Sequence, residues 1–161
     1  MTKQEIHSAF IAQICAKLDA VTQAAKQTFA TATDEAHHAE GKYDTFSLES
    51  SYLARGQAKR VQELTETRDR LEKMQLNSFA ENTPILLSAL IKLESDDGKD
   101  KRTLFFAPCA GGETIEIDGI EIMLITSAAP LGKAIFGKQA GDTFEIKLGP
   151  IPKTFKITSV E

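Results

Sequence analysis

Apolar side chains recur through the first 80 residues in steps of mostly three and four, and this spacing constrains the fold more than any other feature. Such steps place the side chains on one face of an α-helix, with a period close to a heptad. The first stripe consists of Ile6, Phe10, Ile14, Leu18, Val21, Ala25, Phe29 and Ala32. The second stripe, interrupted by Arg68, consists of Leu53, Ala54, Ala58, Val61, Leu64, Leu71 and Met74. Because a helix with one narrow stripe cannot form a core alone, the two helices are predicted to pack as an antiparallel hairpin.

The composition of the chain changes near residue 80. Residues 1–80 contain no proline and two glycines, Gly41 and Gly56, whereas residues 81–161 contain all five prolines and eight glycines. The second half is also rich in β-branched residues, which favour strands. The predicted fold class is therefore α+β, with a helical hairpin over 1–80 and a β domain over 81–161. Each arm of the hairpin would measure about 45–55 Å at 1.5 Å per residue.

The corner of the hairpin is predicted near residues 40–46. Gly41 can end the first helix, because glycine readily adopts the left-handed conformation of a C-cap. The side chain of Asp44, Thr45 or Ser47 can accept hydrogen bonds from the first free amides of the second helix. This tip is acidic, since Glu40 and Asp44 flank the turn.

The second half alternates apolar segments with turns. Its predicted strands are 84–94, 102–108, 113–118, 120–127 and 153–160, and 138–148 is predicted to form a turn and then a strand. A short helix is predicted over 130–137, because Pro130 suits a first helical turn and Gly137 suits an end. This order favours a small, largely antiparallel sheet that wraps around one helix.

Charge and composition exclude several classes of protein. A net charge of −4 argues against a protein that coats nucleic acid by bulk charge. No apolar run approaches the ~20 residues of a membrane span, and the N-terminus lacks the features of a signal peptide. Cys15 and Cys109 do not form a disulfide framework, so we expect a cytoplasmic protein without membrane association.

The last 40 residues resemble a known family. The stretch SAAPLGKAIFGKQAGD, followed by two strands, resembles the end of the bacterial Gre transcript-cleavage factors, GreA and GreB, with one extra alanine before the proline. The matching residues are Ser127, Pro130, Leu131, Gly132, Ala134, Ile135, Gly137, Lys138, Gly141 and Asp142. The resemblance is weaker over 84–126, and in the first half it consists of the hairpin layout and the acidic tip.

This resemblance implies an FKBP-like C-terminal domain that docks on RNA polymerase at the rim of its secondary channel. The residues implied to dock are Ser127, Pro130, Leu131, Gly132, Lys138, Gly141 and Asp142. The hairpin would enter the channel, where Glu40 and Asp44 would help to hold a second Mg²⁺ for cleavage of backtracked RNA. Because one or two carboxylates bind Mg²⁺ poorly, the chain would hold no metal alone and would share Mg²⁺ with the polymerase. It would have no intrinsic cofactor or activity, and would meet nascent RNA indirectly.

The spacing of the tip acids leaves two outcomes open. By direct count Glu40 falls on the first acid of the family pattern, Tyr43 falls on the second, and Asp44 lies one place later. The chain is therefore interpreted either as a factor that stimulates cleavage or as a non-cleaving inhibitor or regulator of the polymerase.

Other residues of the hairpin are candidate contacts. Lys42, Tyr43, Thr45 and Phe46 would meet the channel walls or bases, although aromatic residues also close hairpin turns by packing. The second arm carries a basic face that would meet RNA or acidic channel walls. The alternative is a solvated helix face with intrahelical partners such as Glu63. The residues of this basic arm are Arg55, Lys59 and Arg60.

Two other classes of function stay open. An FKBP-like domain predicts a prolyl isomerase or chaperone, provided that phenylalanines line an open pocket. A coiled-coil adaptor predicts dimerisation through the apolar stripes. The leading interpretation predicts a monomer that binds RNA polymerase.

Overall fold

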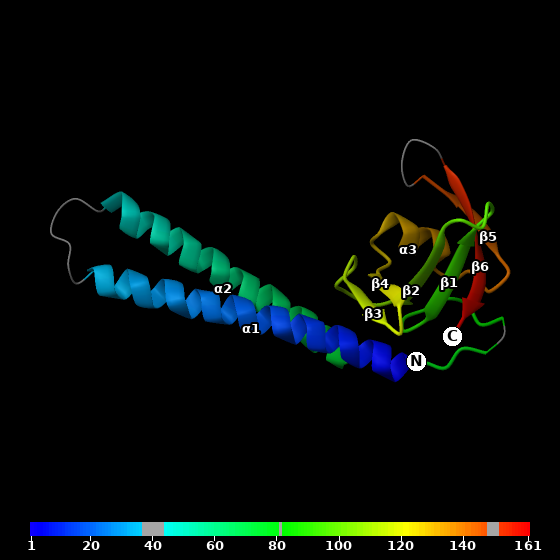
Figure 1. Cartoon of the computed structure of the whole chain (residues 1–161), viewed down its shortest axis with the longest axis horizontal. Coiled ribbons are helices and arrows are strands. Elements are labelled where there is room, and N and C mark those ends of the chain that lie inside the picture. Colours follow the sequence, from blue (N-terminus) through cyan, green and yellow to red (C-terminus); the bar gives the residue numbers. More distant parts are fainter. Residues whose placement is uncertain (37–43, 81, 148–151) are drawn as a thin grey trace. The chain divides into compact units, whose positions relative to one another are not determined.

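The computed structural model describes residues 1–36, 44–80, 82–147 and 152–161, and for residues 29, 31–36 and 44–51 it describes the backbone. Two long helices precede a sheet domain that contains one short helix, so the predicted α+β class is confirmed (Figure 1). The elements are α1 (Lys3–Ala36), α2 (Asp44–Glu72), β1 (Leu90–Ser95), β2 (Lys101–Phe106), β3 (Thr114–Ile117), β4 (Ile120–Ile125), α3 (Pro130–Ile135), β5 (Thr143–Ile146) and β6 (Lys153–Val160).

The chain forms two compact units. The hairpin unit is Ile11–Asp69, and the sheet unit combines Met1–Phe10 with Arg70–Glu161. The boundary predicted near residue 80 follows composition, whereas this division follows contacts. The first residues of α1 and the last residues of α2 thus belong to the sheet unit.

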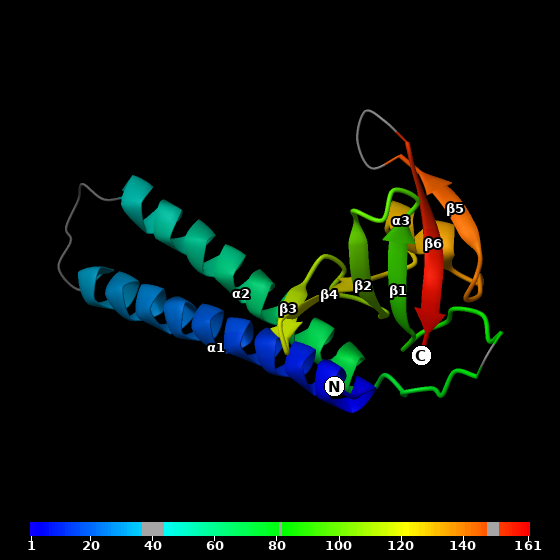
Figure 2. The same ribbon diagram turned by 45° about the vertical axis from the view of Figure 1, so that its right-hand side comes forward.

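In the hairpin unit, α1 and α2 lie side by side in both views (Figures 1 and 2). Ile14 and Leu18 of the first stripe and Ala54 and Leu64 of the second are buried, as the stripes predict. Leu53 is 56% exposed, so the prediction that it packs in the stripe is wrong. Consecutive helical residues point about 100° apart, and Ala54 occupies the inward position. None of the described helices has the length and apolar character needed to cross a membrane.

Ala58 is the second correction to the predicted stripe. It is exposed, although its spacing from Ala54 suggested burial. A row of residues four apart drifts around the helix, and by position 58 the row has left the buried face. The buried stripe of α2 is therefore narrower than the sequence pattern indicates.

The sheet has six strands in the order β3-β4-β2-β1-β6-β5. All neighbouring strands are antiparallel except β2 and β4, which are parallel, so the prediction of a largely antiparallel sheet is confirmed. The strand predicted over 84–94 is too long, because β1 begins at Leu90. Ser88 adopts a left-handed conformation with φ of 70°, and the Ala89 amide donates to the carbonyl of Leu86 at 3.2 Å, which closes a turn.

One face of the sheet packs against α3 and forms the main core of the sheet unit. Side chains alternate along a strand, so Leu104 and Phe106 of β2 face this core while Phe105 faces the opposite side. The core is completed chiefly by Ile91, Leu93, Ile125, Leu131, Ile135, Phe144, Phe155 and Ile157.

The ends of the two long helices pack on the opposite face. The ring of Phe10 stacks on that of Phe105, with centroids 6.2 Å apart and planes at 5°. The buried His7 donates from Nε2 to the carbonyl of Leu71 at 2.8 Å, which fixes its tautomer because a carbonyl can only accept. Arg70 donates to the carbonyl of Pro108 at 2.8 Å. These contacts join the helix ends to the sheet within one unit.

Candidate functional site

Helix α3 fits so closely against the strand before it that one position admits only glycine. A Cβ atom at Gly132 would lie 1.9 Å from the backbone oxygen of Thr126. Pro130 begins the helix, after Ala129 in an extended conformation, and Leu131 and Ile135 are buried beneath it. Leu131 and Gly132 therefore fix α3 on the sheet.

The turn after α3 connects two other segments to it. Gly137, with φ of 77°, donates its amide to the carbonyl of Ile85 at 3.0 Å. The carbonyl of Lys138 accepts from the Ile85 amide at 2.8 Å. This pair of bonds fastens the segment before β1 to the end of the helix.

The glycine and aspartate that end the matching stretch bond to β6. Gly141, with φ of 94°, donates its amide to the carbonyl of Ile157 at 2.8 Å. The carbonyl of Asp142 accepts from the Ile157 amide at 2.9 Å, and its Oδ2 accepts from the Gln139 amide at 2.8 Å. Much of the sequence pattern that carries the Gre resemblance is thus explained by the backbone geometry of this corner.

The residues predicted to dock fall into three groups by exposure to solvent. Leu131 and Gly132 are buried, so they can act on a partner only by holding α3 in place. Lys138 is half-buried, and the remaining four residues are exposed. These exposed residues are Ser127, Pro130, Gly141 and Asp142. All seven lie within residues 127–142 of the sheet unit, and their docking role stays a prediction.

Phe136 is a candidate contact residue that sequence reasoning missed. It is 50% exposed, and its ring centroid lies 5.7 Å from that of the buried Phe106. Leu86 and Leu87, 43% and 40% exposed, lie on the segment whose Ile85 bonds to Gly137. The signal in the sequence was the position of Phe136 directly after the buried Ile135, where the helix periodicity turns a side chain outward.

The tip residues fall mostly outside the described part of the chain. Glu40, Lys42 and Tyr43 lie outside it, whereas Asp44 begins α2 and Thr45 and Phe46 follow in its first turn. Within the described ranges, no group of three or more His, Cys, Asp or Glu side chains is placed to hold a metal ion. The roles of the tip residues therefore stay predictions.

The basic arm is exposed on α2. The Lys59 ammonium and the Arg60 guanidinium lie 4.0 Å and 3.4 Å from the carboxylate of Glu63. Surface pairs of this kind contribute about 0.2–1 kcal/mol, so they leave both cations able to exchange partners. Arg55 is exposed as well, and contact of this arm with RNA or channel walls stays a prediction.

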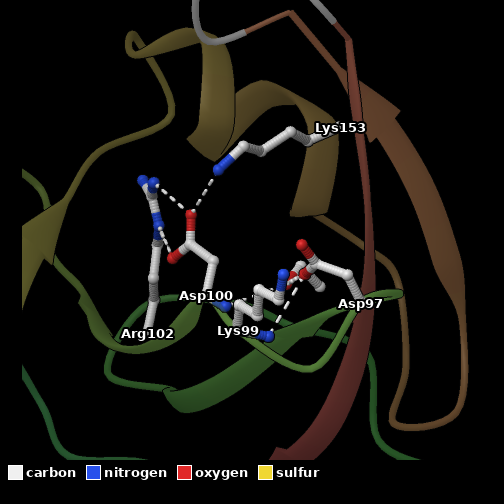
Figure 3. Close-up of polar contacts among 6 residues, drawn as sticks. Asp97, Lys99, Asp100, Arg102 and Lys153 are labelled. Atoms are coloured by element: carbon white, nitrogen blue, oxygen red, sulfur yellow. Dashed lines mark hydrogen bonds and ion pairs between the residues drawn. The ribbon is translucent and has the colours of Figure 1, made fainter.

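A charged cluster that the sequence did not indicate lies at the β1–β2 turn (Figure 3). The guanidinium of Arg102 donates to both carboxylate oxygens of Asp100 at 2.9 Å, and Lys153 donates to Oδ2 at 3.1 Å. The hydrogen bonds from Arg102, followed by that from Lys153, lower the pKa of Asp100 to about 2 although partial burial opposes them. The cluster ties the β1–β2 turn to the start of β6.

Neither a protein-family model nor a curated protein matches the chain. Among solved structures, Gfh1 of Thermus aquaticus is 15% identical, with a TM-score of 0.42 over 92% of both chains. GreA factor homolog 1 (Gfh1) of Thermus thermophilus is 16% identical, with a TM-score of 0.39 over 94% of both chains. The prokaryotic transcription elongation factor GreA/GreB from Nitrosomonas europaea is 21% identical, with a TM-score of 0.38 over 64% of this chain and 92% of that one. Because these identities and scores are low, the activities of these proteins are not transferred to this chain on that ground.

Proposed function

We propose that this chain is a Gre-like transcription factor that binds RNA polymerase. The corner formed by residues 127–142 is the observation that supports this proposal most. Within it, Gly132 seats α3 against Thr126 while Gly141 bonds to β6. This backbone arrangement holds a surface around Pro130 and Phe136 in one geometry, which suits docking on a rigid partner.

The hairpin supplies the second part of the proposal. Helices α1 and α2 contain 34 and 29 residues. In the sequence, Glu40 falls between the two helices, and Asp44 is the first residue of α2. At 1.5 Å per residue the arms measure about 50 and 44 Å, enough for a tip to act at a distance from its docking domain. We propose that the C-terminal domain docks at the secondary channel and that the tip modulates the active centre.

The tip acids act only together with the polymerase. Mg²⁺ keeps several waters and binds weakly to one or two carboxylates, so Glu40 and Asp44 need ligands from the enzyme. In a two-metal site one ion activates water and the other stabilises the leaving oxygen. The shifted position of Asp44 decides whether the tip stimulates cleavage or inhibits the polymerase. The factor acts as a cytoplasmic monomer and meets nascent RNA only through the enzyme.

The prolyl isomerase alternative is not favoured. An isomerase of the FKBP type needs aromatic side chains around an open pocket, whereas Phe106 and Phe155 are fully buried and Phe144 is 8% exposed. Phe144 and Phe155 stack on each other, with centroids 6.0 Å apart. These rings pack in the core of the sheet unit and do not line an open pocket.

The test is an assay on a stalled, backtracked elongation complex of purified bacterial RNA polymerase. Polymerase binding and RNA cleavage are measured separately for the wild type, Glu40→Ala and Asp44→Ala. Asp19→Ala, an exposed acid on α1, is the matched control. We expect wild type to bind and the tip variants to change cleavage without loss of binding. A wild-type chain that does not bind the polymerase overturns the proposal. If wild type binds and RNA cleavage is the same as without it, the chain belongs to the inhibitor class only if transcription slows.

A further inference from the structure

An apolar groove runs between the two helices of the hairpin unit. It is a shallow depression of about 460 Å³ that is widely open to solvent. Its walls come from Ala20, Val21 and Ala24 on α1 and from Leu53, Gly56, Gln57 and Arg60 on α2. Of these residues, Arg60 also belongs to the basic arm, whereas the other six have no role in the proposed function.

Gly56 lines the groove and is exposed, and the structure does not require glycine there. It lies in the interior of α2, where glycine is about 0.8–1 kcal/mol less favourable than alanine. A Cβ atom at this position would meet no atom of the described residues within 4 Å, and the backbone is not left-handed. Glycine therefore lowers helix stability at a position where the described residues would accept a side chain. Local rules of this kind are most often broken at functional sites.

The rim of the groove exposes apolar surface that a partner would cover. Leu53, which lines the groove, is 56% exposed, and Tyr52, its neighbour in the sequence but not a lining residue, is 66% exposed. Gln57 holds a buried Oε1 that finds no hydrogen-bond partner within the described ranges. Buried polar atoms normally have partners, so the groove lacks both apolar cover and one donor.

Charge around the groove indicates which partner fits. Residues 16–28 and 52–63 contain more basic than acidic side chains, although the whole chain has a net charge of −4. The basic residues are Lys17, Lys26, Arg55, Lys59 and Arg60, and the acidic ones are Asp19 and Glu63. Arg60 lines the groove itself, and Lys17 lies on the same face of α1 as Ala20 and Ala24 because residues three or four apart share a face.

We infer that this groove docks an acidic, amphipathic helix of a partner protein. Its apolar residues would lie over Gly56 and against Leu53, and its acidic residues would meet Arg60 and Lys17. A helix fits because small side chains at Ala20, Ala24 and Gly56 allow a third helix to approach two that lie side by side. The inference does not depend on the tip acids or on docking of the C-terminal domain, although Arg60 also belongs to the basic arm predicted to meet channel walls.

The probe is a synthetic, fluorescein-labelled peptide of about 18 residues, made of Glu, Ala and Leu with leucines at helical spacing. Fluorescence anisotropy is measured as the full chain is titrated into the peptide. We expect saturable binding that a matched peptide with lysine in place of glutamate does not show. Gly56→Leu fills the groove and is expected to weaken binding about tenfold or more. Arg60→Glu is expected to weaken binding of the acidic peptide and to create binding of the lysine peptide.

Two controls separate docking from folding. Ala58→Leu adds the same side chain at an exposed position outside the groove lining, and it is expected to leave binding unchanged. Circular dichroism must show that Gly56→Leu keeps or gains helix, so that lost binding does not reflect unfolding. Equal binding by wild type and Gly56→Leu overturns the inference.

Other occupants of the groove are distinguished in the same experiment. A wild-type dimer in light scattering that Gly56→Leu dissociates would assign the groove to a second copy of the chain. Competition of the peptide by a single-stranded RNA oligonucleotide, lost in Gly56→Leu, would assign it to nucleic acid. Either result overturns the acidic helix as the occupant, whereas a monomer without RNA competition supports it.

Discussion

Two glycines mark the difference between the units of this protein. Gly132 in the sheet unit has no room for any side chain, because a Cβ atom would lie 1.9 Å from the Thr126 carbonyl oxygen. Gly56 in the hairpin unit has open space around it within the described residues. The first glycine is required by packing, whereas the second lowers helix stability without a packing reason. The same residue type therefore indicates a closely packed fold in one unit and a surface kept free in the other.

The burial of side chains also differs between the sheet unit and the hairpin unit. In the sheet unit, core residues such as Phe105, Leu104 and Ile91 are fully buried. Among the described side chains of the hairpin unit, the buried ones form a narrow stripe on each helix, and Leu18 remains 9% exposed. A narrow row stabilises two helices modestly and leaves most of their surface to solvent or partners. The sheet unit should thus contribute most of the free energy of unfolding. The hairpin unit should tolerate substitutions at its surface.

The largest expected effect comes from Phe105→Ala. This ring is fully buried and stacks on Phe10, so its removal leaves a cavity at the joint between the helix ends and the sheet. We expect a loss of about 3–5 kcal/mol in the free energy of unfolding, measured by urea denaturation. Leu53→Ala, at an exposed position in the hairpin, should change it by less than about 0.5 kcal/mol. Similar losses for both variants would contradict the contrast between the units.

Gly132→Ala is expected to have the next largest effect. The added Cβ overlaps a backbone oxygen, which cannot move aside as a flexible side chain would. Overpacking of this kind costs about 3 kcal/mol, measured by the same denaturation experiment with hydrogen exchange on β1, β2 and β6. The matched substitution at Gly56 should not destabilise. A variant as stable as wild type would show that α3 can shift from β4.

The helices of this fold could be predicted because their sequence signals are local. Spacing of apolar residues predicted both arms, and Pro130 with Gly137 predicted α3. The sequence could not tell which of Leu53 and Ala54 turns inward, because neighbouring positions differ by about 100° and the partner helix selects one. It also could not show the left-handed Ser88, since this turn depends on a bond from its amide to the Phe106 carbonyl.

The candidate site was predictable only in part, for a related reason. The resemblance selected Leu131 and Gly132 for docking, yet both are buried and explained by packing. Phe136 was missed because exposure of an aromatic residue depends on which strands surround its helix. The ion pairs of Asp100 could not be predicted from the sequence either, because Lys153 is distant in sequence and only strand pairing brings it close.

Asp100 offers a smaller, pH-dependent test on the sheet unit. Its pKa falls from 3.8 to about 2 in the folded chain, so the ionised form stabilises folding above the unfolded value and this stabilisation is lost as the pH falls toward 2. After solvent screening we expect about 1 kcal/mol. Asp100→Asn should thus be less stable than wild type at pH 7, and the gap should close near pH 2. Urea denaturation at both pH values measures it, and a gap independent of pH would assign the loss to packing.

The smallest effect has the opposite sign. Gly56→Ala should stabilise the hairpin by up to about 1 kcal/mol, because alanine restricts the unfolded chain and its Cβ meets no described atom within 4 Å. Both tyrosines of the chain, Tyr43 and Tyr52, belong to the first 80 residues, so their near-ultraviolet signal reports on the hairpin as urea is added. Thr65→Ala is a suitable comparison, since it removes a hydroxyl that donates to the Val61 carbonyl at 2.8 Å elsewhere on the same helix. A destabilised Gly56→Ala would mean that the glycine serves the packing of the helices. A gain in stability would show that no packing contact requires Gly56, which is a condition that the proposed docking groove must meet.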